Sequence, residues 1–271
     1  MQTFGTEKAR NWERLRDRGL RWGAPTPVDV LVGIDDTDNL DSPGTGFRAR
    51  ELVYLLEENG LGRAQGVTRH QLLVHPEVRY TSHNSAACIR LAEVSDIEAV
   101  KRLCRTYLAA ESASGSDAGL CVVPRVSIPD AVCAWGAQAK VDVLHKTGAV
   151  ALAAKHGIYL EGLTGDHGGM IGALAAVGLH RAGNDGRFLW LRNLRESSGR
   201  RLSVSELEQE LGLVVATPAG VDIPLDHEWV ALGEWPRAVF RNDSPVLYVE
   251  RVNENADFQW RMVAKDFIKQ F

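Results

Sequence analysis

The stretch VDVLVGIDDTDNLDSPGTGF, residues 28–47, decides how the chain is organised. Residues 28–34 form a nearly continuous apolar run, which predicts a buried strand. The run stops at DDTDN, residues 35–39, because so many adjacent carboxylates cannot continue a buried strand. A glycine-rich turn follows, and the apolar pattern then predicts a helix over 47–59 that Gly60 ends. The order is therefore strand, polar turn, helix.

The pattern in the rest of the chain predicts an α+β fold. Strands are expected at 71–74, 86–91, 120–123 and 187–192, and helices at 97–110, after the N-cap Asp96, and at 130–156. The order β-β-α-β favours a mixed sheet over a purely parallel one. After about residue 199 the sequence predicts one helix, 205–211, capped by Ser203 or Ser205, and short strands at 229–232, 238–241, 246–252 and 259–263. We therefore expect a helical extension at 1–25, a catalytic region at 26–199 and a small β-rich appendage, with one helix, at 200–271.

Composition and charge are those of an ordinary globular protein. Of the 271 residues, 45% are hydrophobic and 24% are charged, and the formal net charge is −4. A protein that holds nucleic acid mainly by charge is usually basic, so a nucleic-acid partner would need a local basic patch. Residues 6–19 contain several arginines, but the acidic residues between them favour a solvated surface helix over a nucleic-acid arm.

The cysteines and the N-terminal residues predict a cytoplasmic protein. The cysteines at 88, 104, 121 and 133 form no C-x-x-C pair, which argues against a zinc site built from cysteines alone and suits free thiols in a reducing compartment. The N-terminus lacks the apolar core of a signal peptide, and no run approaches the roughly 18 apolar residues needed to cross a bilayer. We therefore expect no membrane partner.

Three carboxylates, those of Asp35, Asp36 and Asp38, follow the first strand. Ligands of open α/β sheets bind beyond this end of a strand. Clustered like charges repel, and Mg²⁺ bound by carboxylates together with phosphate oxygens relieves that repulsion. We therefore predict that all three aspartates are metal ligands and catalytic residues. In the structural alternative, they cap turns and the following helix.

Two glycine-rich loops precede helices and predict a polyphosphate ligand. In SPGTGF, residues 42–47, the backbone at Gly44, Thr45 and Gly46 would approach an anion at the helix N-terminus, although the lysine of a P-loop is absent. In GDHGGMIGALAAVG, residues 165–178, the same role is predicted for Gly165, Asp166, His167, Gly168 and Gly169. The alternative for the second loop is that its small residues permit close packing. Two such loops beside an acidic turn favour a nucleotide over a bare metal ion.

Two further groups of polar residues have two interpretations each. In RYTSHNSAA, residues 79–87, Arg79, His83 and Asn84 either face the same cleft or belong to a polar hairpin turn. Lys140 and Lys146 either reach a phosphate or are solvated helix lysines. Of these, we take His83, Asn84 and Lys146 as nucleotide-binding candidates.

Together these motifs resemble the archaeal agmatinylcytidine synthetases, which modify an isoleucine tRNA. The resemblance spans roughly residues 28–195 and is carried by GIDDTD (33–38), SPGTG (42–46), RYTSHNSAA (79–87) and GDHGGMIGALAAVG (165–178). It implies an ATP-dependent kinase-like domain joined to a ferredoxin-like domain. It also implies that ATP and Mg²⁺ activate a cytidine of the tRNA, which agmatine then attacks.

Matching positions carry the family's site residues onto this chain. The resemblance implies that Asp35, Asp36 and Asp38 handle Mg²⁺ and the ATP phosphates, and that the second glycine-rich loop, with His167, helps to form the nucleotide site. The family has threonines at the start of the helix after the acidic turn, where this chain has only Thr45 as a hydroxyl. The cysteine pairs of the family's zinc ribbon are also missing, and its OB-fold is too large for the tail. We therefore expect the ATP chemistry to be retained better than the tRNA substrate.

The sequence predicts an ATP- and Mg²⁺-dependent enzyme of the kinase or ligase type, whose acceptor is a small molecule or tRNA. The alternative from another class is a nucleotide- or RNA-binding regulatory module without turnover. An aspartyl-phosphate phosphohydrolase, with its D-x-D-x-T pattern, is a weaker match, because Leu40 stands at the fifth position and no later acidic pair follows a second strand.

Overall fold

The computed structural model describes residues 29–78, 80, 81, 83–220, 222, 224–252 and 257–271. The helical extension predicted at 1–25, and Arg79, lie outside these residues. The chain divides between Trp190 and Leu191 into two compact units. Each unit is described by itself.

The larger unit is built on an antiparallel sheet. Its strands are β1 (Val30–Asp35), β2 (Arg63–Gln71), β3 (Ser85–Ala92), β4 (Gly119–Pro124), β5 (Tyr159–Gly162) and β6 (Arg187–Trp190). They lie in the order β5-β4-β1-β3-β2-β6, and each neighbouring pair is antiparallel. The first strand is therefore central, as a strand buried on both faces must be.

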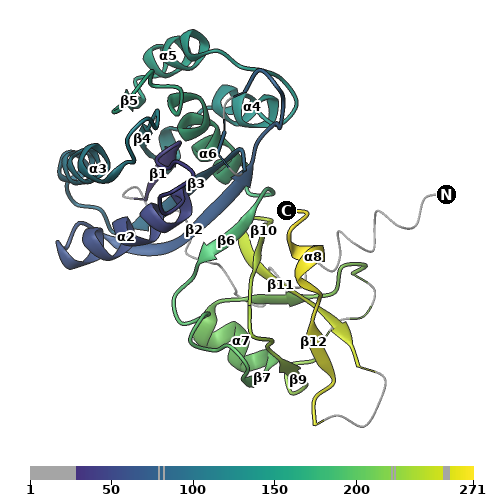
Figure 1. The fold of residues 1–271 in the computed structure, drawn as a ribbon. Helices are drawn as coiled ribbons and strands as arrows, with labels where there is room; N and C mark the ends of the chain where they lie inside the picture. The colour runs from purple at the N-terminus through teal and green to yellow at the C-terminus, as the bar shows by residue number, and fades with distance from the viewer. Residues whose placement is uncertain (1–28, 79, 82, 221, 223, 253–256) are drawn as a thin grey trace. The chain divides into compact units, whose positions relative to one another are not determined.

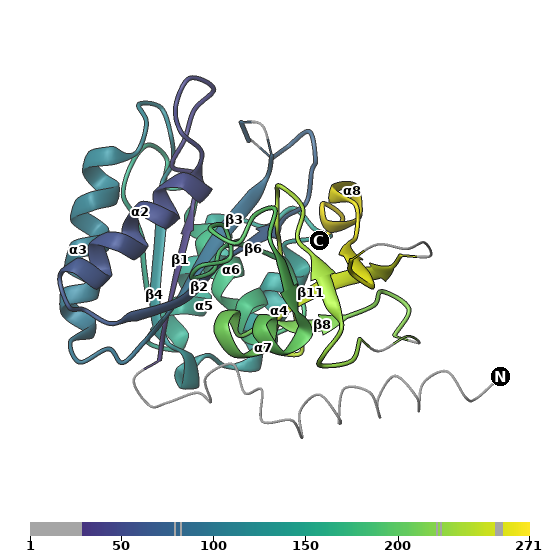
Figure 2. The ribbon, with the colours of Figure 1, turned by 90° about the horizontal axis from the view of Figure 1, so that it is seen from below.

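Helices cover both faces of this sheet (Figures 1 and 2). One face carries α2 (Thr45–Glu58) and α3 (Ile97–Glu111); the other carries α4 (Asp130–Gln138), α5 (Lys146–Lys155) and α6 (Met170–Ala182), with a short 3₁₀ turn, η1 (Arg125–Ser127), before α4. The connectivity β1-α2-β2-β3-α3-β4 is a split β-α-β arrangement. The predicted α+β class is confirmed.

The residues of β1 show why the strand has no polar face. Val32 and Ile34 pack into the core on the α2 side, whereas Leu31 packs on the α6 side. Gly33 lies directly under α6: a Cβ at this position would be 2.1 Å from the carbonyl oxygen of Ala173. The glycine therefore lets α6 approach the strand that carries the acidic turn.

The prediction of one helix over 130–156 is wrong. The structure has two helices, α4 and α5, with a non-helical connection at 139–145 between them. The carbonyl of Ala139 accepts a hydrogen bond from the N–H of Leu73, 3.0 Å away, instead of continuing a helical ladder. A long-range hydrogen bond of this kind leaves no local sequence signal.

The strand predicted at 71–74 is also misplaced, because the pairing residues lie upstream in β2 (Arg63–Gln71). The sequence of this strand, RAQGVTRHQ, is polar and does not show the pattern of a buried strand. Thr68 and His70 are nevertheless fully buried, because they hydrogen-bond to each other at 2.8 Å. The strand predicted at 187–192 ends earlier, at Trp190.

The described residues of the smaller unit, which lie between 191 and 271, form short strands and two helices. They are β7 (Arg201–Ser203), α7 (Val204–Leu211), β8 (Val214–Ala216), β9 (Trp229–Ala231), β10 (Val239–Arg241), β11 (Ser244–Arg251), β12 (Trp260–Met262) and α8 (Lys265–Ile268). The longest strand, β11, pairs with β10, β12 and β8. Ser203, rather than Ser205, caps α7 in a capping box with Glu206. Within the residues that the structure describes, neither unit has a helix with the length and apolarity to cross a membrane.

Candidate nucleotide and metal site

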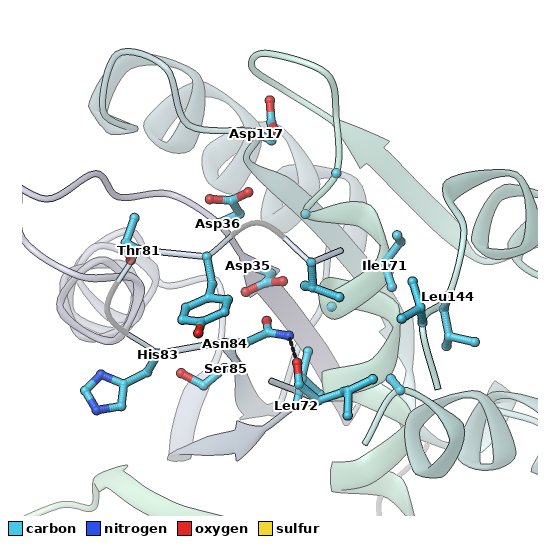
Figure 3. Close-up of a pocket in the computed structure, with 18 of the residues that line it drawn as sticks. Asp35, Asp36, Leu72, Thr81, His83, Asn84, Ser85, Asp117, Leu144 and Ile171 are labelled. Atoms are coloured by element: carbon cyan, nitrogen blue, oxygen red, sulfur yellow. Dashed lines mark hydrogen bonds between the residues drawn. The ribbon is translucent and has the colours of Figure 1, made fainter. Parts of the chain in front are cut away.

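A pocket of about 360 Å³ lies beyond the end of β1, entirely within the larger unit. This volume falls in the range of about 300–1,000 Å³ that is usual for small-molecule sites. Five segments line it: the end of β1 with the turn and the first residue of α2 after it, the segment between β2 and β3, the residue Asp117 before β4, the α4–α5 connection, and the second glycine-rich loop with the start of α6. Figure 3 shows Asp35, Asp36 and Asp117 on one side, and Leu144 and Ile171 on another.

The acidic turn is bent at Asp36, whose φ of +52° lies in the left-handed region. Non-glycine residues rarely take this conformation. The bend interrupts the alternation of a strand, under which Asp35 would face away from Asp36 and Asp38. All three aspartates consequently line the same pocket.

The environment of Asp35 and Asp36 resists their ionisation. Burial, followed by the charge of Asp36, raises the pKa of Asp35 to about 8. Burial, followed by the charge of Asp117, raises the pKa of Asp36 to about 6. A nearby cation favours the ionised form of a carboxyl group and would oppose both shifts. This end of the pocket therefore has the electrostatic character of a cation site.

Asp117, which the sequence analysis missed, is a fourth carboxylate of this pocket. Its Oδ1 accepts a hydrogen bond from the N–H of Asp166 at 2.5 Å, and its carbonyl accepts one from Gly169 at 2.8 Å. The first residue of β4, Gly119, pairs with Asp35 because β4 runs antiparallel to β1. An acidic residue just before a strand that pairs with β1 is the signal that would have found it, but the pairing is not visible in the sequence.

Asp38 has a structural role in the turn. One of its oxygens accepts hydrogen bonds from the hydroxyl of Thr45, at 2.8 Å, and from the N–H of Thr45, at 3.2 Å. The other oxygen accepts a hydrogen bond from Thr81 at 2.8 Å. Asp38 thus satisfies a backbone donor in the first turn of α2, where Gly44 offers no side-chain cap. For Asp38, a role in capping the turn and α2 therefore fits better than a role as a metal ligand.

The second glycine-rich loop packs around the carboxylates. A Cβ at Gly172 would lie 1.9 Å from Oδ2 of Asp35, and one at Gly165 would lie 2.0 Å from Oδ1 of Asp117. A Cβ at Gly169 would meet the carbonyl oxygens of Asp117 and Asp35 at 2.7 Å. The small residues therefore permit close packing, and what they pack against is the acidic end of the pocket.

The other predicted residues divide into those in the pocket and those beside it. Thr45, His83, Asn84, Asp166, Gly168 and Gly169 line the pocket. Asn84 donates a hydrogen bond to the carbonyl of Leu73 at 2.5 Å, and Figure 3 shows the ring of His83 directed away from the aspartates.

The rest are not among the lining residues: Gly44, Gly46, Lys146, Gly165 and His167. The Nζ of Lys146 donates to the carbonyl of Asp166, so this lysine contacts the loop from outside. His167 packs against Gly162 of β5: a Cβ added at Gly162 would lie 2.2 Å from the Cβ of His167. Lys140, also considered for a phosphate, is paired with Asp185 at 2.5 Å.

The donor set fits Mg²⁺ shared with a ligand better than a cage made by the protein alone. Among the residues that the structure describes, no three His, Cys, Asp or Glu side chains are grouped to hold a metal ion. Mg²⁺ in nucleotide sites usually has one or two carboxylates, with phosphate oxygens and water completing its shell. Asp36 and Asp117, whose charges act on each other, fit that requirement.

Comparison with known proteins gives only partial structural likenesses. No family model and no curated protein matches the chain. The crystal structure of a tRNA fluorescent labeling enzyme is similar with a TM-score of 0.49 and 26% identity, over 55% of this chain and 36% of that one. The complex of TiaS, an agmatidine synthetase that acts on an isoleucine tRNA, with that tRNA and ATP has a TM-score of 0.49 and 25% identity, over 56% of this chain and 36% of that one.

This chain therefore spans about a third of the length of the structures that it matches. A likeness of this extent does not assign an activity, so the function is argued from the residues of the pocket.

Proposed function

We propose that the protein is an ATP- and Mg²⁺-dependent enzyme that either transfers a phosphoryl group to its substrate or activates the substrate by means of a phosphoryl group. The observation that carries the proposal is the meeting of two distant motifs in one pocket. The acidic turn at Asp35 and Asp36 and the glycine-rich loop at Gly168 and Gly169 both line it. These are the two elements that a metal-bound polyphosphate requires: carboxylates for the cation and a helix N-terminus for the anion.

The two sides of the pocket suit the two ends of a nucleotide. Asp36 and Asp117 would hold the cation, and the positive end of the α6 dipole, at Met170, favours phosphate groups next to it. Leu72, Leu144 and Ile171 offer an apolar surface of the kind that binds a flat base. When bound, Mg²⁺ supplies neutralising charge to the phosphoryl group as its bond loosens.

The remaining residues would act through charge and proton occupancy. Asp35, whose pKa is about 8, holds a proton at neutral pH when the pocket contains no cation. Cation binding therefore competes with that proton. Asp38 holds the turn against α2 through Thr45 and against the segment between β2 and β3 through Thr81. In this proposal the acceptor is a small molecule or a nucleoside within RNA, and only the RNA acceptor comes from the sequence resemblance.

The test is a product assay with purified protein, ATP and Mg²⁺, with and without bulk tRNA and small amines as acceptors. We expect release of ADP, AMP or pyrophosphate, and a loss of roughly 100-fold or more for Asp36→Asn, because removing a charge from a metal clamp removes transition-state stabilisation. Asp41→Asn is the matched control, since Asp41 is exposed in the same loop and does not line the pocket.

Three outcomes separate the candidate functions. Equal product release by the wild type and Asp36→Asn would contradict the proposal. Tight binding of ATP without any product under all acceptor conditions would favour the regulatory module. Hydrolysis of a phosphomonoester without ATP would favour the phosphohydrolase.

A further inference from the structure

A buried chain of polar side chains connects one wall of the pocket to the sheet and to α6. The Nζ of Lys140 lies 2.5 Å from Oδ2 of Asp185, and Oδ1 of Asp185 lies 2.9 Å from Nδ1 of His70. The Nε2 of His70 is 2.8 Å from the hydroxyl of Thr68, which is 2.9 Å from Nδ1 of His180 on α6. Each contact is within hydrogen-bond distance.

This series of hydrogen-bonded side chains runs from the surface into the core. The side chain of Lys140 is 33% exposed and that of Asp185 is 21% exposed, whereas His70, Thr68 and His180 are fully buried. Hydrogen bonding to His70 and Lys140 outweighs the effect of burial and lowers the pKa of Asp185. Asp185 is therefore a charged link between the α4–α5 connection, at Lys140, and strand β2, at His70, and is not an isolated surface carboxylate.

The local backbone is shaped to make this contact. Gly186, next to Asp185, has φ +88°, and a Cβ there would lie 2.4 Å from the carbonyl oxygen of Arg69 and 2.8 Å from Nδ1 of His70. Only glycine fits a left-handed conformation pressed so closely against a strand. The residue after Asp185 thus brings the carboxylate to His70.

The segment that Lys140 anchors is a wall of the pocket. Residues 139–145 have no regular helix or strand, and five of them line the pocket: Ala139, Asp142, Val143, Leu144 and His145. A connection without regular structure keeps one position only where side chains or long-range bonds hold it. The backbone bond from Leu73 to Ala139 holds its start, and the next residue is Lys140.

A polar network in this position needs a reason beyond stability. Well-packed apolar residues stabilise a core as well as a buried ion pair does, whereas a satisfied polar network specifies one arrangement. The network starts at Lys140, next to the lining residue Ala139, and ends at His180 in the last turn of α6, the helix whose first turn lines the pocket. It therefore ties the 139–145 segment to β2 and to the far end of α6.

We propose that Asp185 is a positioning residue that, through Lys140, holds the 139–145 wall in place for the ligand of the pocket. The identity of that ligand as a nucleotide rests on the proposed function. Asp185 does not line the pocket and contacts no reacting group. Its effect is therefore on how well the ligand is held.

The test compares Asp185→Asn and Lys140→Met with Lys155→Met, which removes an exposed lysine from the far end of α5. Two properties are measured on the full chain: amide hydrogen exchange of residues 139–145 without ligand, and the dissociation constant of a non-hydrolysable ATP analogue with Mg²⁺. Loss of a positioning contact typically costs about 10- to 100-fold in affinity or activity. We expect both variants to exchange at least about tenfold faster at 139–145 and to bind the analogue about tenfold more weakly.

Two further measurements distinguish a positioning role from a purely structural one. The double variant should bind no more weakly than either single variant, because the two residues act as one link. Turnover at saturating nucleotide should stay within about threefold of the wild type, so that KM changes and kcat does not. A fall in thermal stability with unchanged exchange at 139–145 and unchanged affinity would overturn the proposal. If the wild type itself binds no nucleotide, the proposed function fails, and the exchange experiment still decides whether Asp185 holds this wall.

Discussion

The two loops are both rich in glycine but have different surroundings. At Gly44 in the first loop, an added Cβ would meet nothing within 4 Å. At Gly172 in the second, it would overlap the carboxylate of Asp35, and at Gly165 that of Asp117. The first loop is open at Gly44, although a Cβ at Gly46 would lie 2.7 Å from the side chain of Leu189, and the second is packed around the acidic residues. Glycine-rich sequence alone therefore does not separate a ligand cradle from a packing requirement, and here the packed loop also shapes the site.

Among the substitutions that test this comparison of the loops, Gly172→Ala should give the largest effect. The new methyl group would displace the side chain of Asp35, and a misplacement of about 1 Å near the chemistry can cost roughly 100-fold in rate. We expect turnover of Gly172→Ala to fall by about 100-fold, whereas Gly44→Ala should stay within about threefold of the wild type. Steady-state assays of both variants measure the contrast. Equal losses would mean that the two loops act alike.

Substitution of Asp117 by asparagine should give the next largest effect. We expect turnover to fall about 10- to 100-fold and the Mg²⁺ concentration for half-maximal activity to rise, because one of the proposed metal-facing carboxylates is lost. Asp142→Asn changes a carboxylate in the α4–α5 wall of the same pocket and serves as the control. A Mg²⁺ titration of each variant gives the result. An unchanged requirement in Asp117→Asn would remove this residue from the metal site.

The acidic end of the pocket should also make stability depend on pH. Because the folded-state pKa values of Asp35 and Asp36 are raised, the native protein binds more protons than the unfolded chain between about pH 4 and 8. Without metal, the contribution of Asp35 and Asp36 to the free energy of unfolding is fully present below about pH 4 and is lost as the pH rises toward 8. We expect Asp36→Asn in EDTA to be roughly 1–2 kcal/mol more stable than the wild type at pH 8, and equal to it near pH 4.

Chemical denaturation at the two pH values measures this difference, and Mg²⁺ with a nucleotide should reduce it at pH 8. The same stability for both proteins at every pH would show that neither burial nor neighbouring charge raises the pKa of Asp36 in the folded protein.

The smallest effect on activity is expected for Asp38→Asn. One oxygen of Asp38 accepts from the N–H and hydroxyl of Thr45, and asparagine keeps such an acceptor, so the variant should lose less than about 1 kcal/mol of stability. Turnover should stay within about tenfold of the wild type. Thermal melts and activity assays compare it with Asp36→Asn. A loss as large as that of Asp36→Asn would restore Asp38 as a direct ligand.

Much of the fold could be predicted because its signals are local. The apolar run of β1, the Asp96 cap of α3 and the Ser203 cap of α7 each lie within a few residues of the element that they define. The break between α4 and α5 could not be predicted, because it depends on the contact of Ala139 with Leu73. The strand β2 was misplaced because Thr68 and His70 are polar and are buried only through their hydrogen bonds.

The residues of the site also differ in whether local sequence alone indicates them. Asp35 and Asp36 are visible in the sequence because the acidic turn is contiguous. Asp117 is not, because only the antiparallel pairing of β4 with β1 brings it there. His167 and Lys146 were chosen for their place in the sequence, and the fold turns the first toward β5 and leaves the second outside the loop.

The most direct test of the account is a titration of Mn²⁺, as a paramagnetic substitute for Mg²⁺, in the presence of a non-hydrolysable ATP analogue, followed by electron paramagnetic resonance. We predict that free Mn²⁺ disappears from the spectrum as one ion binds each wild-type chain with the analogue, and that Asp36→Asn and Asp117→Asn bind it at least about tenfold more weakly. Binding of the analogue with the same affinity in EDTA, or by all three proteins alike, would contradict the account.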